Sequence, residues 1–170
     1  MTTEPDHKLR IWVDADACPA AIKEVLFRTG KRLGIEVVLV ANQSMWTPES
    51  SLVRVITVRD GANIADNTIV EQMQSGDVVI TSDIPLAARV VEKSGIAIGT
   101  RGEVFDDSSV HSRLASRDVM EHLRSAGMDT RGPRPLTQKD IQNFSNALDR
   151  TLTRIRKTNL GHEATRVSET

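Results

Sequence analysis

The hydrophobic and polar positions along the chain follow two different periods. Short, nearly continuous apolar runs are typical of strands that are buried on both faces. They alternate with segments whose apolar residues recur every three or four positions, as on one side of a helix. The apolar runs predict strands at residues 10–16, 35–42, 52–58, 77–82 and 96–99. The helical pattern covers residues 18–34, 60–76 and 84–95.

This alternation predicts an α/β fold, a three-layer α/β/α sandwich around a mostly parallel sheet of roughly five strands. One connection fits poorly, because the link between the strands at 35–42 and 52–58 is short for a parallel crossover. From Gly102 onward the pattern is only helical, with helices predicted at 110–127 and 136–157 and a loop rich in glycine, proline and arginine between them.

The pattern also sets the domain organisation. We expect a single domain over residues 10–157, of which 103–157 form a helical C-terminal part. Residues 1–9 are polar and are expected to be frayed. The tail 158–170 carries no apolar stripe and is expected to be disordered.

Residues with known preferences mark several helix ends. Pro19 suits the first position of a helix, where its missing N–H has no partner to lose, and Gly34 suits a C-cap. Thr137 is an N-cap candidate for the last helix, with Asp140 three residues later.

Composition narrows the class of protein. Of the 170 residues, 39% are hydrophobic and 26% charged, which is ordinary for one soluble globular domain. With three Phe, two Trp and no Tyr, the core must be aliphatic, and an aromatic platform for stacking bases is not expected. No apolar run is long enough to cross a membrane, and the N-terminus has no apolar signal region. A single cysteine fits a reducing cytoplasm.

Acidic residues recur where predicted strands end. "VDADACPAA" (13–21) and "ITSDIPLAA" (80–88) share one order: an apolar strand, an aspartate, a proline and two alanines that open a helix. The polar residues that follow the strands, or open the next helix, are Asp14, Asp16, Asn42, Asp66 and Asp83. Because parallel strands end at one edge of a sheet, these side chains converge if the first and fourth strands are neighbours.

Such a cluster of carboxylates repels itself, so either some pKa values rise or a cation neutralises the charge. Oxygen ligands without a histidine or cysteine framework favour Mg²⁺ or Mn²⁺. One or two such ions activate water and stabilise the leaving oxygen of a phosphodiester. Helix capping explains each of Asp16, Asp66 and Asp83 equally well when taken singly. It does not explain Asp14, which precedes its helix by several residues.

Other chemically active residues have simpler interpretations. Cys18 lies near a helix start, which lowers a thiol pKa, but no histidine is nearby in sequence and a structural role is favoured. Glu71 is either close to the acidic edge or solvated, and the second is favoured. His111 and His122 have no ligand partner four residues away, which argues against zinc.

Basic residues gather in the second half of the chain. The net charge is −1, yet residues 101–157 carry 11 basic and 8 acidic side chains. Arginine suits bidentate contact with phosphate, and the candidates are Arg101, Arg117, Arg131 and Arg134. Arg101 lies between Gly99 and Gly102, which allow backbone to approach a ligand closely. A solvated basic surface is the alternative for each of them.

These motifs also carry a family resemblance. "VDADACP", "VANQ", "GANIADNTIVE", "GDVVITSDIPLAA" and "GPRPLTQKDIQNF" occur in order over about residues 10–153 and resemble the YaiI/YqxD family of uncharacterised bacterial proteins. That family is similar to PIN-like nuclease domains, which bind Mg²⁺ or Mn²⁺ at the carboxyl edge of the sheet and cut RNA. The resemblance implies metal-binding roles for Asp14, Asp66 and Asp83, with Asp16 completing the "DAD" signature.

One position departs from the family pattern, and two other functions stay open. Asn63 stands where "GADAAD" has an aspartate; it keeps a carbonyl oxygen but removes one charge, which argues against a second metal or tight binding of the first. We therefore expect a metal-dependent phosphodiesterase acting on RNA or another phosphate-bearing substrate, with Asn42 and Asn63 among the substrate-binding residues. The first alternative is a non-catalytic nucleic-acid- or protein-binding module.

The second alternative rests on the "DAD" motif, which also resembles the nucleophile motif of haloacid-dehalogenase phosphatases. In that motif the first aspartate is phosphorylated and the second is an acid/base. It normally continues with Thr or Val, whereas Cys18 and Pro19 follow here, and no well-placed lysine comes before the fourth strand.

Overall fold

The structure is a computed structural model that describes residues 8–125 and 134–168. One sheet contains the strands β1 (Arg10–Asp14), β2 (Glu36–Ala41), β3 (Val53–Thr57), β4 (Val78–Ile80), β5 (Ile96–Ile98) and β6 (Val104–Phe105). The α-helices of the described residues are α1 (Ala20–Leu33), α2 (Ile64–Gln72), α3 (Ile84–Glu92), α4 (Asp107–Ser125) and α5 (Gln138–Ser168). A 3-10 turn, η1 (Ala15–Ala17), follows β1.

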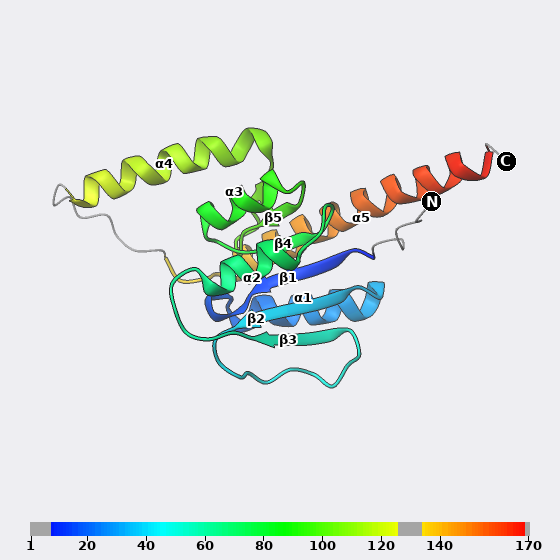
Figure 1. The fold of residues 1–170 in the computed structure, drawn as a ribbon, viewed down its shortest axis with the longest axis horizontal. Coiled ribbons are helices and arrows are strands. Elements are labelled where there is room, and N and C mark those ends of the chain that lie inside the picture. Colours follow the sequence, from blue (N-terminus) through cyan, green and yellow to red (C-terminus); the bar gives the residue numbers. More distant parts are fainter. Residues whose placement is uncertain (1–7, 126–133, 169–170) are drawn as a thin grey trace.

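Helices cover both faces of the sheet (Figure 1), so the predicted three-layer sandwich is confirmed. Alternation along β1 shows why: Ile11 and Val13 pack with residues of α1 and α5, whereas Trp12 between them packs with residues of α2 and α3. All three β1 side chains are fully buried, as expected for a central parallel strand. Helix α4 lies against the outside of α3.

The strand order is β3-β2-β1-β4-β5-β6, and every neighbouring pair is parallel except β5 with β6. The β2–β3 pair is therefore parallel although its connection, residues 42–52, contains no helix. An extended segment of that length reaches about 35 Å, enough to return along a six-residue strand of about 20 Å. The sixth strand was not predicted, because two residues are too few to show a period.

Several helix boundaries differ from the prediction. Helix α1 begins at Ala20, with Pro19 as its N-cap, and ends at Gly34 in the left-handed conformation that glycine favours. Helix α4 begins at Asp107 rather than residue 110, because Asp106 accepts hydrogen bonds from the backbone N–H groups that follow it.

Helix α5 extends further than the sequence pattern predicted. The helix continues to Ser168, so the prediction that it ends at 157 and gives way to a disordered tail is wrong. The stretch 158–168 contains no proline to break the helix, so the absence of an apolar stripe does not by itself mark the end of the helix. At the other terminus, the frayed segment predicted at 1–9 lies outside the described residues except for its last two, of which Leu9 packs against the core.

Asp77 is a buried charge that the sequence pattern did not reveal. Its side chain accepts hydrogen bonds from the Arg10 backbone N–H (3.1 Å), the Trp12 indole (3.0 Å) and the Gln74 backbone N–H (3.0 Å). A carboxylate surrounded by donors in this way is stabilised despite its burial. Asp77 thus ties β4 to β1 at the amino ends of the strands, opposite the edge where Asp14 lies.

Candidate functional site

The order in which strands are added to the sheet reverses at β1. From β1 the chain builds outward to β2 and β3 on one side, and then returns to add β4 and β5 on the other. In open parallel sheets a crevice forms beyond the carboxyl ends of the strands at such a switch point, and ligands bind there. Asp14 ends β1, and the pairing of Val13 with Ile80 sets Thr81 and Asp83 just beyond the end of β4.

Asp14 is half-buried, as Asp66 is, whereas Asp16 and Asp83 are exposed. Burial, together with the charges of Asp66, Asp83 and Asp16, raises the pKa of Asp14 to about 6. A hydrogen bond from the Thr81 hydroxyl, over 3.3 Å, opposes the rise because it stabilises the ionised form. The carboxylates that the sequence placed at one edge therefore interact with one another in the structure.

Asp66 comes to the site on the first turn of α2, which lies across β1 and β2. Burial raises the pKa of Asp66, and the charge of Asp83 adds to the effect, while Arg89 lowers it. Two of the four acids thus have raised pKa values. This is the electrostatic signature of a place where a cation would be favourable.

Asp83 and Asp16 also have local structural roles. Asp83 caps α3, since its Oδ1 accepts the Leu86 backbone N–H at 3.0 Å. Asp16 Oδ2 accepts the Asn42 backbone N–H at 2.8 Å, which joins η1 to the end of β2. Capping is therefore part of the explanation for Asp83. Both side chains are exposed, and a carboxylate has room for further partners on its oxygens.

The donor set fits a hard divalent cation, although the side chains are not drawn together around one point. No three His, Cys, Asp or Glu residues within 8–125 and 134–168 are placed to hold an ion jointly. Mg²⁺ does not need such a cage, because it keeps several waters and binds through one or two carboxylates plus substrate phosphate. Asp14, Asp66 and Asp83 are the carboxylates at this edge that could act as such ligands.

The two asparagines predicted to contact substrate lie near this edge in different settings. Asn42 is half-buried, and its Nδ2 donates to Asp60 Oδ1 at 2.9 Å. Asn63 is exposed and precedes α2 with φ of 64°, a left-handed conformation that asparagine tolerates well. Its side chain makes no capping bond. A contact of either asparagine with substrate stays a prediction.

The predicted arginines separate into two groups. Arg101 and Arg134 both pair with Asp140, Arg101 at 2.6 Å and Arg134 at 2.8 Å, so they link the turn after β5 to the start of α5. Gly102 belongs to the same junction: it has a φ of 93°, and a Cβ there would lie 2.7 Å from the Asn143 carbonyl oxygen. The close approach that the sequence suggested for a ligand is thus made to α5. Arg131 lies outside the described residues.

Arg117 lies next to the acidic edge, in a cavity of about 400 Å³ between the β4–α3 turn and α4. Its lining residues are Ser82, Asp83, Ile84, Arg113, Ser116, Arg117 and Met120. Sequence reasoning missed Arg113. The signal was present, because Arg113 and Arg117 are four residues apart and so share one face of a helix, but the partner of that face was not predictable.

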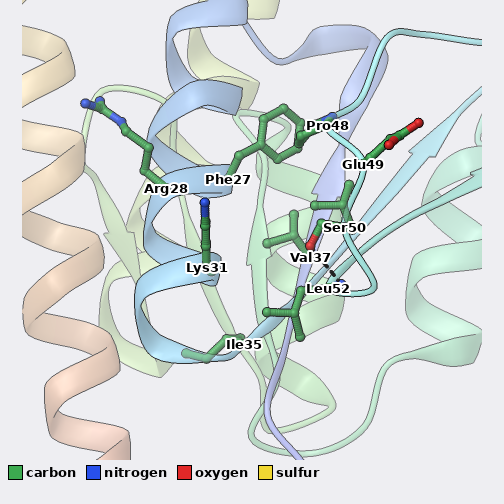
Figure 2. Close-up of a pocket in the computed structure, with 11 residues that line it drawn as sticks. Phe27, Arg28, Lys31, Ile35, Val37, Pro48, Glu49, Ser50 and Leu52 are labelled. Carbon is green, nitrogen blue, oxygen red and sulfur yellow. Dashed lines mark hydrogen bonds between the residues drawn. The ribbon is translucent and has the colours of Figure 1, made fainter.

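A second cavity, of about 280 Å³, lies between α1 and the segment that leads into β3. Figure 2 shows the Phe27 ring beside Pro48, with Ile35, Val37 and Leu52 below, while the Arg28 side chain points away from it. None of the predicted site residues lines this cavity. It is an apolar gap under a connecting loop.

The remaining candidates have structural or solvated settings. Cys18 is buried, and burial raises the pKa of its thiol to about 12, so the thiol is not activated. Glu71 and His111 are exposed, as favoured for Glu71. The side chain of His122 lies outside what the structure describes.

Fold and site together define a doubly wound, mostly parallel α/β protein with acidic side chains gathered at its switch point. The family described as "Uncharacterized BCR, YaiI/YqxD family" matches residues 12–154. The chain belongs to this family.

Relatives match over nearly the whole chain. UPF0178 proteins of Herminiimonas arsenicoxydans and Hydrogenovibrio crunogenus are each 51% identical, covering 88% and 86% of this chain and 100% and 97% of their own lengths. A UPF0178 protein of Yersinia pestis is 50% identical over 87% of this chain and 97% of its own. No solved structure matches. Within the described residues, no helix is long and apolar enough to cross a membrane.

Proposed function

We propose that this protein is a Mg²⁺- or Mn²⁺-dependent phosphodiesterase that acts on RNA. Asp14, Asp66 and Asp83 hold the ion, and Asp16 is either a further ligand or the base that orients water. The supporting observation is that these carboxylates lie near one another at the switch point of the sheet, where burial and the neighbouring charges raise the pKa values of Asp14 and Asp66. A divalent cation relieves that repulsion.

The ion, when bound, supplies a Lewis acid and lowers the pKa of a bound water. The protein's own residues do the rest. Asp14 must lose its proton to bind, and the Thr81 hydroxyl favours the ionised form. Asp16 lies on the exposed side, where its free oxygen can accept a proton from the attacking water. The water oxygen then bonds to phosphorus and the bond from phosphorus to the leaving oxygen breaks. The leaving oxygen takes up a proton from solvent, and Asp16 releases to solvent the proton that it accepted.

The resemblance to PIN-like nucleases belongs to this proposal. In the sequence it rested on an acid after the first strand, one at a helix start and one after the fourth strand. Asp14 ends β1, Asp66 lies in the first turn of α2 and Asp83 is the N-cap of α3. That placement supports a shared way of binding metal and phosphate.

Cleavage of end-labelled single-stranded and structured RNA with Mn²⁺ tests the proposal. We expect cleavage by the natural protein and its loss in the double variant Asp14→Asn/Asp83→Asn. Asparagine is a good N-cap, so the second change removes charge while keeping the start of α3. Asp149→Asn, which removes a carboxylate on α5 far from the edge, is the matched control. Activity that persists in the double variant overturns the assignment.

A non-catalytic RNA-binding module is the second candidate, and one observation favours it. Among the described residues the acids are near one another without being placed around one ion. Such a module binds RNA equally well in EDTA and in Mn²⁺ and leaves it intact in both. The cleavage experiment with a parallel binding measurement separates the two functions.

A further inference from the structure

We propose that the cavity between the β4–α3 turn and α4 holds the backbone of single-stranded RNA, with Arg113 and Arg117 contacting its phosphates. This inference deepens the proposed function and rests on it for the identity of the polymer. The cavity is about 400 Å³ in volume, and Asp83 of the acidic edge forms part of its wall. A strand lying in it therefore passes directly beside the carboxylates.

The two arginines provide two similar phosphate-binding groups, one helical turn apart. They stand four residues apart on α4, so they share one face and are separated by about 6 Å along the helix axis. Ser116 lies on the same wall, and Ser82 faces it from the β4–α3 turn. Guanidinium groups bind phosphate bidentately, and hydroxyls add hydrogen bonds to backbone oxygens. The wall formed by α4 is thus chemically suited to successive phosphates of one strand.

The position of Arg113 and Arg117 beside the acidic edge suggests that they offset its negative charge when RNA approaches. The acidic edge repels a polyanion, so a strand that approaches it needs cations close by. Arg113 is exposed and forms no ion pair with any residue in the described parts of the chain. Arg101 and Arg134 differ from Arg113, since both pair with Asp140. Arg113 is therefore the more informative of the two groove arginines.

The cavity also has an apolar end, which favours a single strand over a duplex. Ile84 and Met120 line it, and Met120 is 40% exposed, so part of its apolar side chain is open to a ligand. An unpaired base can be laid against such side chains, whereas the bases of a duplex are stacked and paired inside it.

Binding of a fluorescein-labelled 12-nucleotide RNA, followed by anisotropy in EDTA so that no cleavage occurs, tests this inference. We expect Arg113→Ala/Arg117→Ala to weaken binding about tenfold or more and to reduce the salt slope by about 1.4, the value for two phosphate contacts on a single strand. Arg150→Ala/Arg154→Ala is the matched control: the same charge change and the same spacing, on exposed positions of α5. Circular dichroism checks that both variants fold.

Each outcome decides the matter. Equal loss in both double variants shows a diffuse basic surface and overturns the groove, as does binding of poly-glutamate with the same dependence on Arg113 and Arg117. No binding of RNA by the natural protein overturns it too. If the natural protein cleaves RNA but the groove variant binds normally, the groove fails and the proposed function stands. If binding needs the arginines but nothing is cleaved, the groove stands and the proposed function fails.

Discussion

The Thr81 hydroxyl donates a hydrogen bond to Asp14 Oδ2 over 3.3 Å, from the end of one central strand to the end of its neighbour. Thr81 Oγ1 in turn accepts a hydrogen bond from the Asp83 backbone N–H at 3.0 Å. Thr81 is buried, so the surrounding side chains fix the position of its hydroxyl. One hydroxyl therefore favours the ionised form of Asp14 and supports the backbone that presents Asp83.

Replacing Thr81 with valine removes the hydroxyl and keeps nearly the same side-chain shape, so it tests both hydrogen bonds without changing the packing. We expect the pKa of Asp14 to rise above its value of about 6, because the hydrogen bond that favours the carboxylate is lost. We also expect the free energy of unfolding to fall by about 1–3 kcal/mol, since the Asp83 N–H loses its acceptor. Carboxyl-carbon NMR titration and urea denaturation measure the two. Thr151→Val, at a buried threonine of α5, is the control that should leave the Asp14 pKa unchanged.

The raised pKa of Asp14 makes stability depend on pH in a defined direction. The folded state binds this proton more tightly than the unfolded chain, whose value is 3.8. The stabilising contribution is therefore complete below about pH 4 and is lost as pH rises through about 6. Asp14→Asn avoids the loss, so without metal the variant should be more stable than the natural protein by about 2 kcal/mol at pH 7.5, after a discount for partial solvent access.

Thermal denaturation at pH 4 and pH 7.5, in EDTA, measures this effect. The gain from Asp14→Asn should be present at the higher pH and absent at the lower one. Asp149→Asn, at an exposed ion pair, should show no such gain at either pH. A constant difference between Asp14→Asn and the natural protein at both values would show that packing, rather than charge, controls Asp14.

The sheet and its acidic edge were predictable because local patterns specify them. Apolar runs and helical stripes fixed which segments alternate, and parallel strands bring their carboxyl ends to one edge whatever their order. Asp14 was informative in the sequence because it precedes the next helix by several residues, so helix capping does not explain its presence. In the structure it is also the acid with the most strongly raised pKa of its group.

What the sequence did not reveal depends on contacts between distant segments. Arg101 looked like a ligand residue, but its partner Asp140 is 39 residues away and becomes visible only when α5 packs beside β5. Arg113 carried a helical spacing with Arg117, yet its function depends on α4 lying against α3. Strand β6 was missed for a simpler reason, since two residues have no measurable period.

Cys18 gives a test of burial that needs no variant. Its thiol is 7% exposed, and burial raises its pKa to about 12. We expect no reaction with Ellman's reagent at pH 8 in the folded protein and one equivalent after unfolding in guanidinium, because the chain has a single cysteine. Rapid modification of the native protein would contradict the assignment of Cys18 as a structural residue.

Asp140 is expected to be the most sensitive ion-pair residue of the C-terminal part. It accepts hydrogen bonds from Arg101, Arg134 and the Thr137 N–H, and Arg134 is the main cause of its lowered pKa. Asp140→Asn should lower the melting temperature more than Asp149→Asn does, because the latter breaks one exposed pair only. For a lowered pKa the stabilisation is present above about pH 4 and lost below it, so the difference should shrink in acid.

Metal binding at the acidic edge should be visible as linked stability, independently of any cleavage. Mn²⁺ at a hundred times its dissociation constant stabilises a folded protein by about 2.7 kcal/mol, and we expect that gain at pH 7.5 for the natural protein and for Asp149→Asn. It should be much smaller for Asp14→Asn, which removes the central carboxylate. At pH 5, below the Asp14 pKa of about 6, protons compete with the ion and the gain should shrink in the natural protein as well. Equal stabilisation of Asp14→Asn and the natural protein by Mn²⁺ would place the ion elsewhere, and would return Asp14 and Asp83 to a structural explanation.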